Sequence, residues 1–108
     1  MPRGQMKPPS VDDLLKAAGE AENGGLARAG RALQKHGDRP ATAFSRPASN
    51  SPKALNPAGQ NVVDEILTNQ GSQFRPNRLG GWDVRTPDGR DVRFNPDGSF
   101  RGFLEPNK

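Results

Sequence analysis

The stretch WDVRTPDGRDVRFNPDGSFRGFL, residues 82–104, decides the fold, because polar and apolar side chains alternate along it with a period of two. The tripeptide Pro-Asp-Gly occurs in it twice, at 87–89 and 96–98. Proline and aspartate favour a type I turn, and glycine favours the left-handed position that follows, so each tripeptide predicts a three-residue hairpin loop. The stretch therefore predicts three antiparallel strands, over 82–86, 91–95 and 99–104.

The loop lengths set the register of the two hairpins and place the apolar side chains together on one face of the sheet. In the first hairpin, the predicted pairs are Trp82 with Phe94, Asp83 with Arg93, Val84 with Val92 and Arg85 with Asp91. In the second, they are Phe94 with Phe100, Arg93 with Arg101, Val92 with Gly102 and Asp91 with Phe103.

The opposite face of this sheet carries charged side chains and one aromatic ring, and two interpretations of it stay open. In the first, an anion lies over the opposed Arg93 and Arg101, and an exposed Phe103 stacks on a base. In the second, the face is solvated and Asp83 and Asp91 neutralise the arginines.

The N-terminal part of the chain predicts helices behind a short tail. Residues 1–9 are rich in proline and lysine, which predicts a disordered tail before a single domain over 10–108. Ser10 has the side chain of a helix N-cap, and apolar residues follow it at helical spacing. The Asn-Gly-Gly sequence at 23–25 ends that helix.

A second helix is expected over residues 26–35, with Gly37 as its stop. It carries a basic stripe at spacing i, i+3, i+7, made by Arg28, Arg31 and Lys35. His36, the single histidine of the chain, follows at the end of this stripe.

A long loop over 37–55, either functional or mobile, leads to a third helix that begins at Asn56-Pro57 and runs to about Asn69. Residues 74–78 add a possible fourth strand. The whole pattern predicts an α+β fold in which N-terminal helices pack on a small three- to four-stranded antiparallel meander.

Composition narrows the chemistry. The 108 residues hold 16 lysines and arginines against 12 acidic residues, a net charge of +4, and a basic surface attracts polyanions. The chain has no cysteine and one histidine, which excludes disulfides, thiolate metal sites and paired-histidine zinc sites, so no metal or cofactor is expected. No stretch approaches the roughly 20 apolar residues of a membrane span.

A lone histidine among basic residues suits RNA cleavage. RNA supplies its own nucleophile, the 2′-hydroxyl, so an enzyme needs a group that moves a proton near neutral pH and cations that stabilise charge on phosphorus. We expect His36 and the guanidinium of Arg101 on the last strand to converge on one phosphate pocket.

Three segments resemble the C-terminal toxin modules of bacterial polymorphic and contact-dependent growth inhibition toxins, and more distantly the colicin D-like tRNA nucleases. They are GRALQKHG at 30–37, VVDEIL at 62–67 and NPDGSFRGFL at 95–104. The resemblance implies the barnase/EndoU/colicin/RelE-like fold and a metal-independent endoribonuclease that cleaves tRNA in the anticodon region, leaving a 2′,3′-cyclic phosphate.

The resemblance also implies roles for individual residues. The Lys35-His36 step is the catalytic motif, and the last strand carries further active-site residues at Arg101 and Phe103, where the colicin D-like nucleases have serine and tryptophan. The predicted catalytic residues are His36, Lys35 and Arg101. The predicted substrate-binding residues are Arg31, Arg39, Arg85, Arg93 and Phe103.

Such a toxin implies a protein partner and a route of delivery into a target cell. A cognate acidic immunity protein is expected to cover the basic face, and the domain is expected to be a monomer outside that complex. Delivery from a secreted or cell-surface precursor would let it act in the target-cell cytoplasm. The rival hypotheses are a non-catalytic basic module that binds nucleic acid or protein, and a toxin that acts on DNA or a nucleotide.

Overall fold

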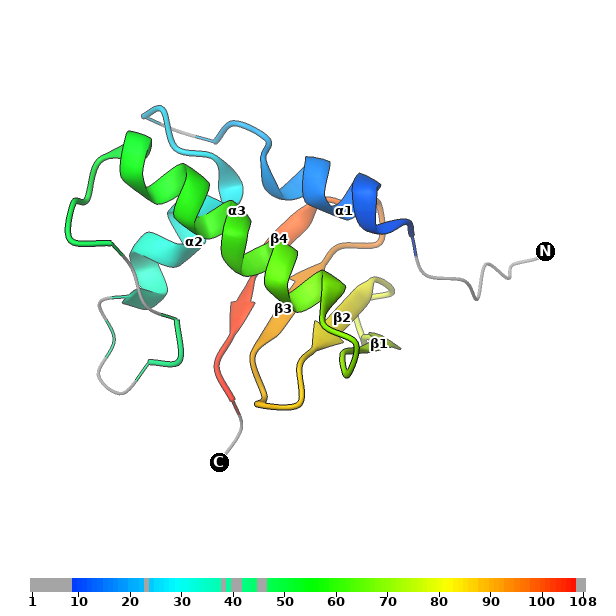
Figure 1. Cartoon of the computed structure of the whole chain (residues 1–108). Helices are drawn as coiled ribbons and strands as arrows, with labels where there is room; N and C mark the ends of the chain where they lie inside the picture. The colour runs from blue at the N-terminus through cyan, green and yellow to red at the C-terminus, as the bar shows by residue number, and fades with distance from the viewer. Residues whose placement is uncertain (1–8, 23, 38, 40–41, 45–46, 107–108) are drawn as a thin grey trace.

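Helices pack against an antiparallel sheet in this protein (Figure 1). The computed structural model describes residues 9–22, 24–37, 39, 42–44 and 47–106. Within them the chain forms, in order, α1 (Val11–Ala18), α2 (Arg28–Gly37), α3 (Pro52–Thr68), β1 (Gln73–Pro76), β2 (Trp82–Arg85), β3 (Asp91–Phe94) and β4 (Phe100–Leu104). The predicted α+β architecture is confirmed. The predicted tail over 1–9 lies outside the described residues except for Pro9.

The sheet is a meander in the order β1-β2-β3-β4. Gly89 and Gly98 close the two turn tripeptides with φ of 94° and 91°, where a residue without a Cβ meets no steric penalty. The predicted pairing of β2 with β3 is confirmed at all four positions, and β1 pairs with β2 near the predicted fourth strand at 74–78. Backbone hydrogen bonds close both loops, from Thr86 N–H to Arg90 O and from Asn95 N–H to Ser99 O.

The last hairpin departs from the predicted register at a β-bulge. Its pairs are Phe94 with Phe100, as predicted, then Arg93 with Gly102, Val92 with Phe103 and Asp91 with Leu104. Arg101 is the extra residue of β4. The predicted pairs of Arg93 with Arg101, Val92 with Gly102 and Asp91 with Phe103 are therefore wrong.

The bulge follows from the spacing of two phenylalanines. Phe100 and Phe103 are three residues apart, so in a regular strand their rings would point to opposite faces. The extra residue turns both rings into the core, where each is 3% exposed. Burying a phenylalanine side chain contributes roughly 2–3 kcal/mol, which outweighs the interrupted pairing.

The helix α1 begins as predicted. The Ser10 side chain accepts a hydrogen bond from the Asp13 N–H at 3.1 Å, and Leu14, Ala17 and Ala18 face the core. The helix ends at Gly19, before the predicted break at 23–25.

The start of α3 corrects the prediction at Asn56-Pro57. The helix begins at Pro52, after Ser51, because this Ser-Pro pair gives the same start signal earlier in the chain. Asn56 instead binds the backbone at the start of α2, where its Oδ1 accepts a hydrogen bond from the Ala27 N–H at 2.8 Å. Pro57 lies inside the helix.

The helices α2 and α3 cross closely enough to exclude side chains at the contact. A Cβ atom on Gly59 would lie 2.5 Å from the carbonyl oxygen of Ala29, and one on Gly30 would collide with Asn56. The helix α2 contacts α3 through this crossing and also packs against β4. The core between helices and sheet includes Leu14, Leu33, Phe44, Val63, Ile66, Val84, Val92 and Phe94.

Candidate active site

The central residue of the candidate site is His36, which lies in the last turn of α2. Its side chain is 8% exposed, and its Nδ1 atom lies 2.7 Å from the Glu105 Oε2 atom beyond β4. The rings of Phe44 and Phe103 meet the imidazole edge-on, with centroids at 5.2 and 5.9 Å, and stack on each other at 4.7 Å. Packing and a polar contact therefore fix the orientation of the imidazole together.

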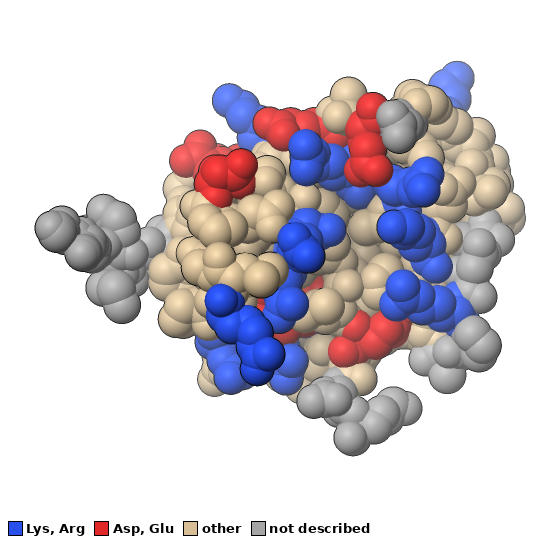
Figure 2. Space-filling model, turned by 180° about the vertical axis from the view of Figure 1, so that it is seen from behind, with Lys and Arg blue, Asp and Glu red and all other residues tan. Residues whose placement is uncertain are grey.

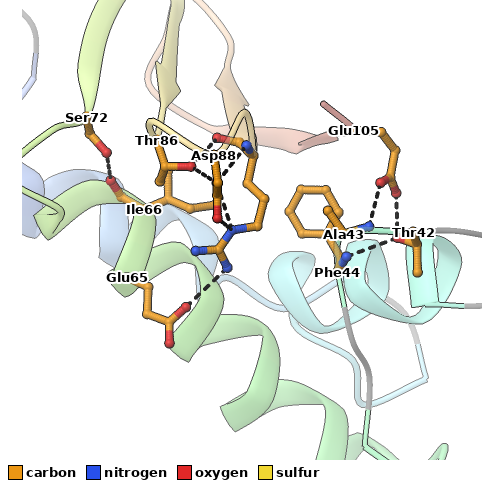
Figure 3. A network of polar contacts seen from close by, with 10 residues as sticks. Thr42, Ala43, Phe44, Glu65, Ile66, Ser72, Thr86, Asp88 and Glu105 are labelled. Carbon is orange, nitrogen blue, oxygen red and sulfur yellow. Dashed lines mark hydrogen bonds and ion pairs between the residues drawn. The ribbon is translucent and has the colours of Figure 1, made fainter. Parts of the chain in front are cut away.

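The Glu105 carboxylate is held in turn by the segment after α2 (Figure 3). The Thr42 hydroxyl donates to its Oε2 at 2.6 Å, and the Ala43 N–H donates to its Oε1 at 2.9 Å. Burial alone would raise the pKa of Glu105, but the hydrogen bonds from Thr42, Ala43 and His36 outweigh it and hold this pKa below its ordinary value. The carboxylate is therefore ionised at neutral pH.

The ionised Glu105 decides the tautomer of His36. A carboxylate can accept hydrogen bonds but has none to donate, so the proton of a neutral imidazole lies on Nδ1. The Nε2 atom keeps its lone pair, and no hydrogen bond occupies it within the described part of the chain. Arg39 Nη1 lies 3.2 Å from the same Nδ1 atom, but in this tautomer both atoms are donors, so the shorter contact with Glu105 is the hydrogen bond and Arg39 adds only a positive charge beside it.

A cavity of about 220 Å³ opens between α2 and β4 next to His36. Figure 2 shows a band of lysine and arginine side chains on the side of the molecule that α2 occupies. Five basic residues and one glutamate contribute to the lining, which comprises Glu22, Arg28, Arg31, Ala32, Lys35, His36, Arg39, Arg101, Gly102 and Phe103. The expected convergence of His36 and Arg101 on one pocket is found.

Of the predicted site residues, the structure brings six to this cavity: Arg31, Lys35, His36, Arg39, Arg101 and Phe103. Phe103 lies there as a buried wall, so its predicted exposure and its stacking on a base are wrong. The β-bulge that buries this ring leaves Arg101 exposed at the cavity.

The other two predicted residues, Arg85 and Arg93, do not line the cavity. Arg93 donates two hydrogen bonds to Asp83, at 2.8 and 2.9 Å, and Arg85 donates one to Asp91 at 3.1 Å. Of the two interpretations that the sequence left open for this face, the structure favours the neutralised one.

Sequence reasoning missed Glu105, Thr42 and the part that Arg28 plays in the cavity. Glu105 directly follows the last strand, and a carboxylate at the end of the strand that carries Arg101 was an available signal. Thr42 lies in a segment without periodicity, so no pattern could have identified it. In the part of the chain that the structure describes, no three His, Asp or Glu side chains gather as metal ligands would.

The structure is thus a small α+β domain with a basic pocket around one histidine, and such a pocket attracts polyanions. The chain belongs to the family of CdiA C-terminal tRNase toxin domains, whose model matches residues 15–105. The protein is thus a toxin of contact-dependent growth inhibition and an endoribonuclease that cleaves tRNA.

A solved structure supports the same assignment. The chain is similar to the toxic C-terminal tip of CdiA from Pseudomonas aeruginosa, determined in complex with its immune protein, at 32% identity and a TM-score of 0.66. The match covers 82% of this chain and 98% of the other. The search of curated proteins finds no match.

Proposed function

We propose that the cavity between α2 and β4 is the active site, and that the domain cleaves tRNA in its anticodon region by attack of the ribose 2′-hydroxyl, without a metal ion. The observation that carries this proposal is the His36 imidazole, whose Nδ1–H is held by the ionised Glu105 inside a basic pocket. This arrangement leaves one nitrogen lone pair for the substrate.

In the first step, His36 Nε2 takes the proton of the 2′-hydroxyl as general base. The 2′-oxygen attacks the adjacent phosphorus, and the imidazolium that forms is stabilised by Glu105. The bond from phosphorus to the 5′-oxygen then breaks, that oxygen takes up a proton from a solvent water molecule, and the imidazolium afterwards returns its proton to the solvent. The products are a 2′,3′-cyclic phosphate and a 5′-hydroxyl.

The cations of the cavity act on the phosphorus centre. Lys35 lies on α2 and Arg101 on β4, so they approach the phosphorus from two sides. Both stabilise the extra negative charge of the phosphorane. Arg31 and Arg39 lie on the same side and hold the neighbouring phosphates.

The test is cleavage of total tRNA in the presence of EDTA, with the products analysed for their end groups. His36→Asn is the sharpest variant, because the asparagine amide can still donate to Glu105 but has no base in place of Nε2. We expect wild-type cleavage to persist in EDTA and the variant to lose at least about 100-fold in rate. Undiminished cleavage by a folded His36→Asn protein contradicts the mechanism.

The basic pocket also fits the proposed partner, a cognate acidic immunity protein that covers it. The P. aeruginosa relative was solved with an immune protein, and five cations around one cavity make a matching surface for carboxylates. We propose delivery from a cell-surface precursor and action in the target-cell cytoplasm, as a monomer outside this complex. Co-purification with a small acidic protein encoded next to the toxin, with loss of cleavage, is the expected result; an immunity protein that binds without blocking cleavage would contradict coverage of the pocket.

A further inference from the structure

A second, larger cavity lies on the other side of Arg28, between α1 and the turn that joins β3 to β4. Its volume is about 530 Å³, within the range of sites that hold small organic groups. Arg28 lines both this cavity and the catalytic one. The two cavities therefore adjoin at Arg28.

The two cavities differ in charge. The catalytic cavity has five basic residues and one glutamate in its lining. The lining of the second cavity has three carboxylates, Asp13, Glu20 and Asp97, against Lys16 and Arg28. Figure 2 shows acidic side chains toward the upper edge of the molecule, where α1 lies. A phosphate is thus suited to the first cavity, and an uncharged group that donates hydrogen bonds is suited to the second.

Arg28 has unused capacity at the junction. Its Nη1 donates to the Phe100 carbonyl at 3.4 Å, and its buried Nε, which has no hydrogen-bond partner among the described residues, forms a long ion pair of 3.8 Å with Glu20. The Arg28 side chain as a whole is 38% exposed, so a phosphate placed between the two cavities would accept from the exposed part of the guanidinium. Such a phosphate belongs to a strand that passes from one cavity to the next.

We infer that the second cavity is a nucleobase subsite for the residue of the RNA strand next to the cleaved bond, and that its base is guanine. This inference rests on the proposed function of the catalytic cavity. Guanine offers two adjacent donors, N1–H and the N2 amino group, and a carboxylate accepts both together. The rings of Pro9 and Pro96 supply apolar faces in the same lining.

The two carboxylates that read the base differ in what else they do. Asp97 Oδ1 accepts hydrogen bonds from the N–H and hydroxyl of Ser99, at 2.9 and 2.7 Å, which leaves its second oxygen as an acceptor for one guanine donor. Asp13 lies exposed in the first turn of α1. An asparagine at either position keeps one oxygen acceptor and replaces the other with a donor.

The experiment uses a short single-stranded RNA that contains the bond cleaved in tRNA, with guanine, inosine or adenine placed in turn at each flanking position. Affinity is measured with the His36→Asn protein, which leaves the RNA intact, and kinetics with the active protein. Asp13→Asn and Asp97→Asn are compared with Asp12→Asn. Asp12 is the adjacent exposed carboxylate outside the cavity lining, so the net charge changes equally in all three.

We expect Asp13→Asn and Asp97→Asn to raise both Kd and KM about tenfold on the guanine RNA while kcat stays unchanged. The Asp12→Asn protein should bind within about twofold of its parent. Inosine in place of guanine should weaken binding to the wild-type cavity and add little further loss in the two variants.

Two outcomes overturn the subsite and leave the proposed function standing. If all three variants bind and discriminate alike while cleavage continues, the cavity reads no base. If Asp13→Asn and Asp97→Asn bind RNA more tightly than Asp12→Asn, the cavity repels RNA and fits a basic protein segment. A wild-type protein that cleaves neither this RNA nor total tRNA refutes the proposed function, and the affinity series with the His36→Asn protein still decides the subsite.

Discussion

The molecule carries two groups of basic side chains that composition does not distinguish. On the sheet side, Arg85, Arg90 and Arg93 each lie within 3.2 Å of a carboxylate, and two of those carboxylates, Asp88 and Glu65, are drawn in Figure 3. In the pocket, no carboxylate of the described residues lies within ion-pair distance of Arg31, Lys35 or Arg101. The net charge does not show which basic side chains are available to an anion. The positions of the carboxylates decide that.

The largest expected effect separates the two groups directly. Arg101→Ala should lower kcat for tRNA cleavage about 100- to 1000-fold, because it removes a fixed charge at the phosphorane. Arg93→Ala, which removes an arginine already paired with Asp83, should leave kcat unchanged within about twofold. Single-turnover cleavage measures both variants. An equal loss of rate in the two would show that the arginines of the pocket and of the sheet do not differ in function.

The next effect concerns Glu105, whose carboxylate binds the imidazole of His36 and not an arginine. Glu105→Gln keeps an oxygen that can accept from His36 Nδ1 but loses the charge that stabilises the imidazolium. We expect kcat to fall about 100-fold with little change in KM. Glu65→Gln, on the sheet side, is the matched control, and an equal loss of kcat there would remove any special part for Glu105.

A third effect sharpens the comparison through the buried carboxylate of the sheet. Burial raises the pKa of Asp91 to about 6, with the nearby Asp83 adding to it and the Arg85 contact opposing it. A raised pKa means that the folded state holds its proton more tightly than the unfolded state does. Stability from this group is therefore full below about pH 4 and is lost as the pH rises through about 6.

The variant Asp91→Asn isolates that contribution. Between pH 4 and pH 7 the wild type should lose up to about 3 kcal/mol of unfolding free energy relative to Asp91→Asn. Urea unfolding at both pH values measures the difference. If the two proteins follow parallel pH profiles, Asp91 does not titrate in this range.

The smallest effect belongs to the paired arginine on the sheet. The contact of Arg93 with Asp83 is bidentate and half-buried, so a double-mutant cycle with Arg93→Ala and Asp83→Asn should give a coupling of about 1 kcal/mol. Thermal unfolding measures it at moderate salt. A coupling near zero would mean that these side chains neutralise the face without stabilising it.

Sequence reasoning reached the first hairpin and the main site residues for local reasons. The Pro-Asp-Gly loops fix the pairing of Val84 with Val92, and a histidine at the end of a basic helix is visible without a structure. It failed where distant residues decide the outcome. The bulge at Arg101 arises because Phe100 and Phe103 must both reach a core formed mainly by other elements.

The same limit explains two further differences. Asn56 looks like a helix cap, and only its contact with Ala27 across the α2–α3 crossing shows which helix end it serves. Glu105 and His36 are 69 positions apart, so no local pattern links them. Local chemistry was therefore readable from the sequence, and long-range partners were not.

The separation of those partners has a consequence for when this toxin becomes dangerous. The groups that orient the imidazole come from the end of α2, from residues 42–44 and from the chain beyond β4, and they meet when the last strand has docked. An unfolded chain keeps these groups far apart and has no assembled catalytic site. Any condition that holds the chain unfolded therefore also holds it inactive, and folding of the last strand restores the site.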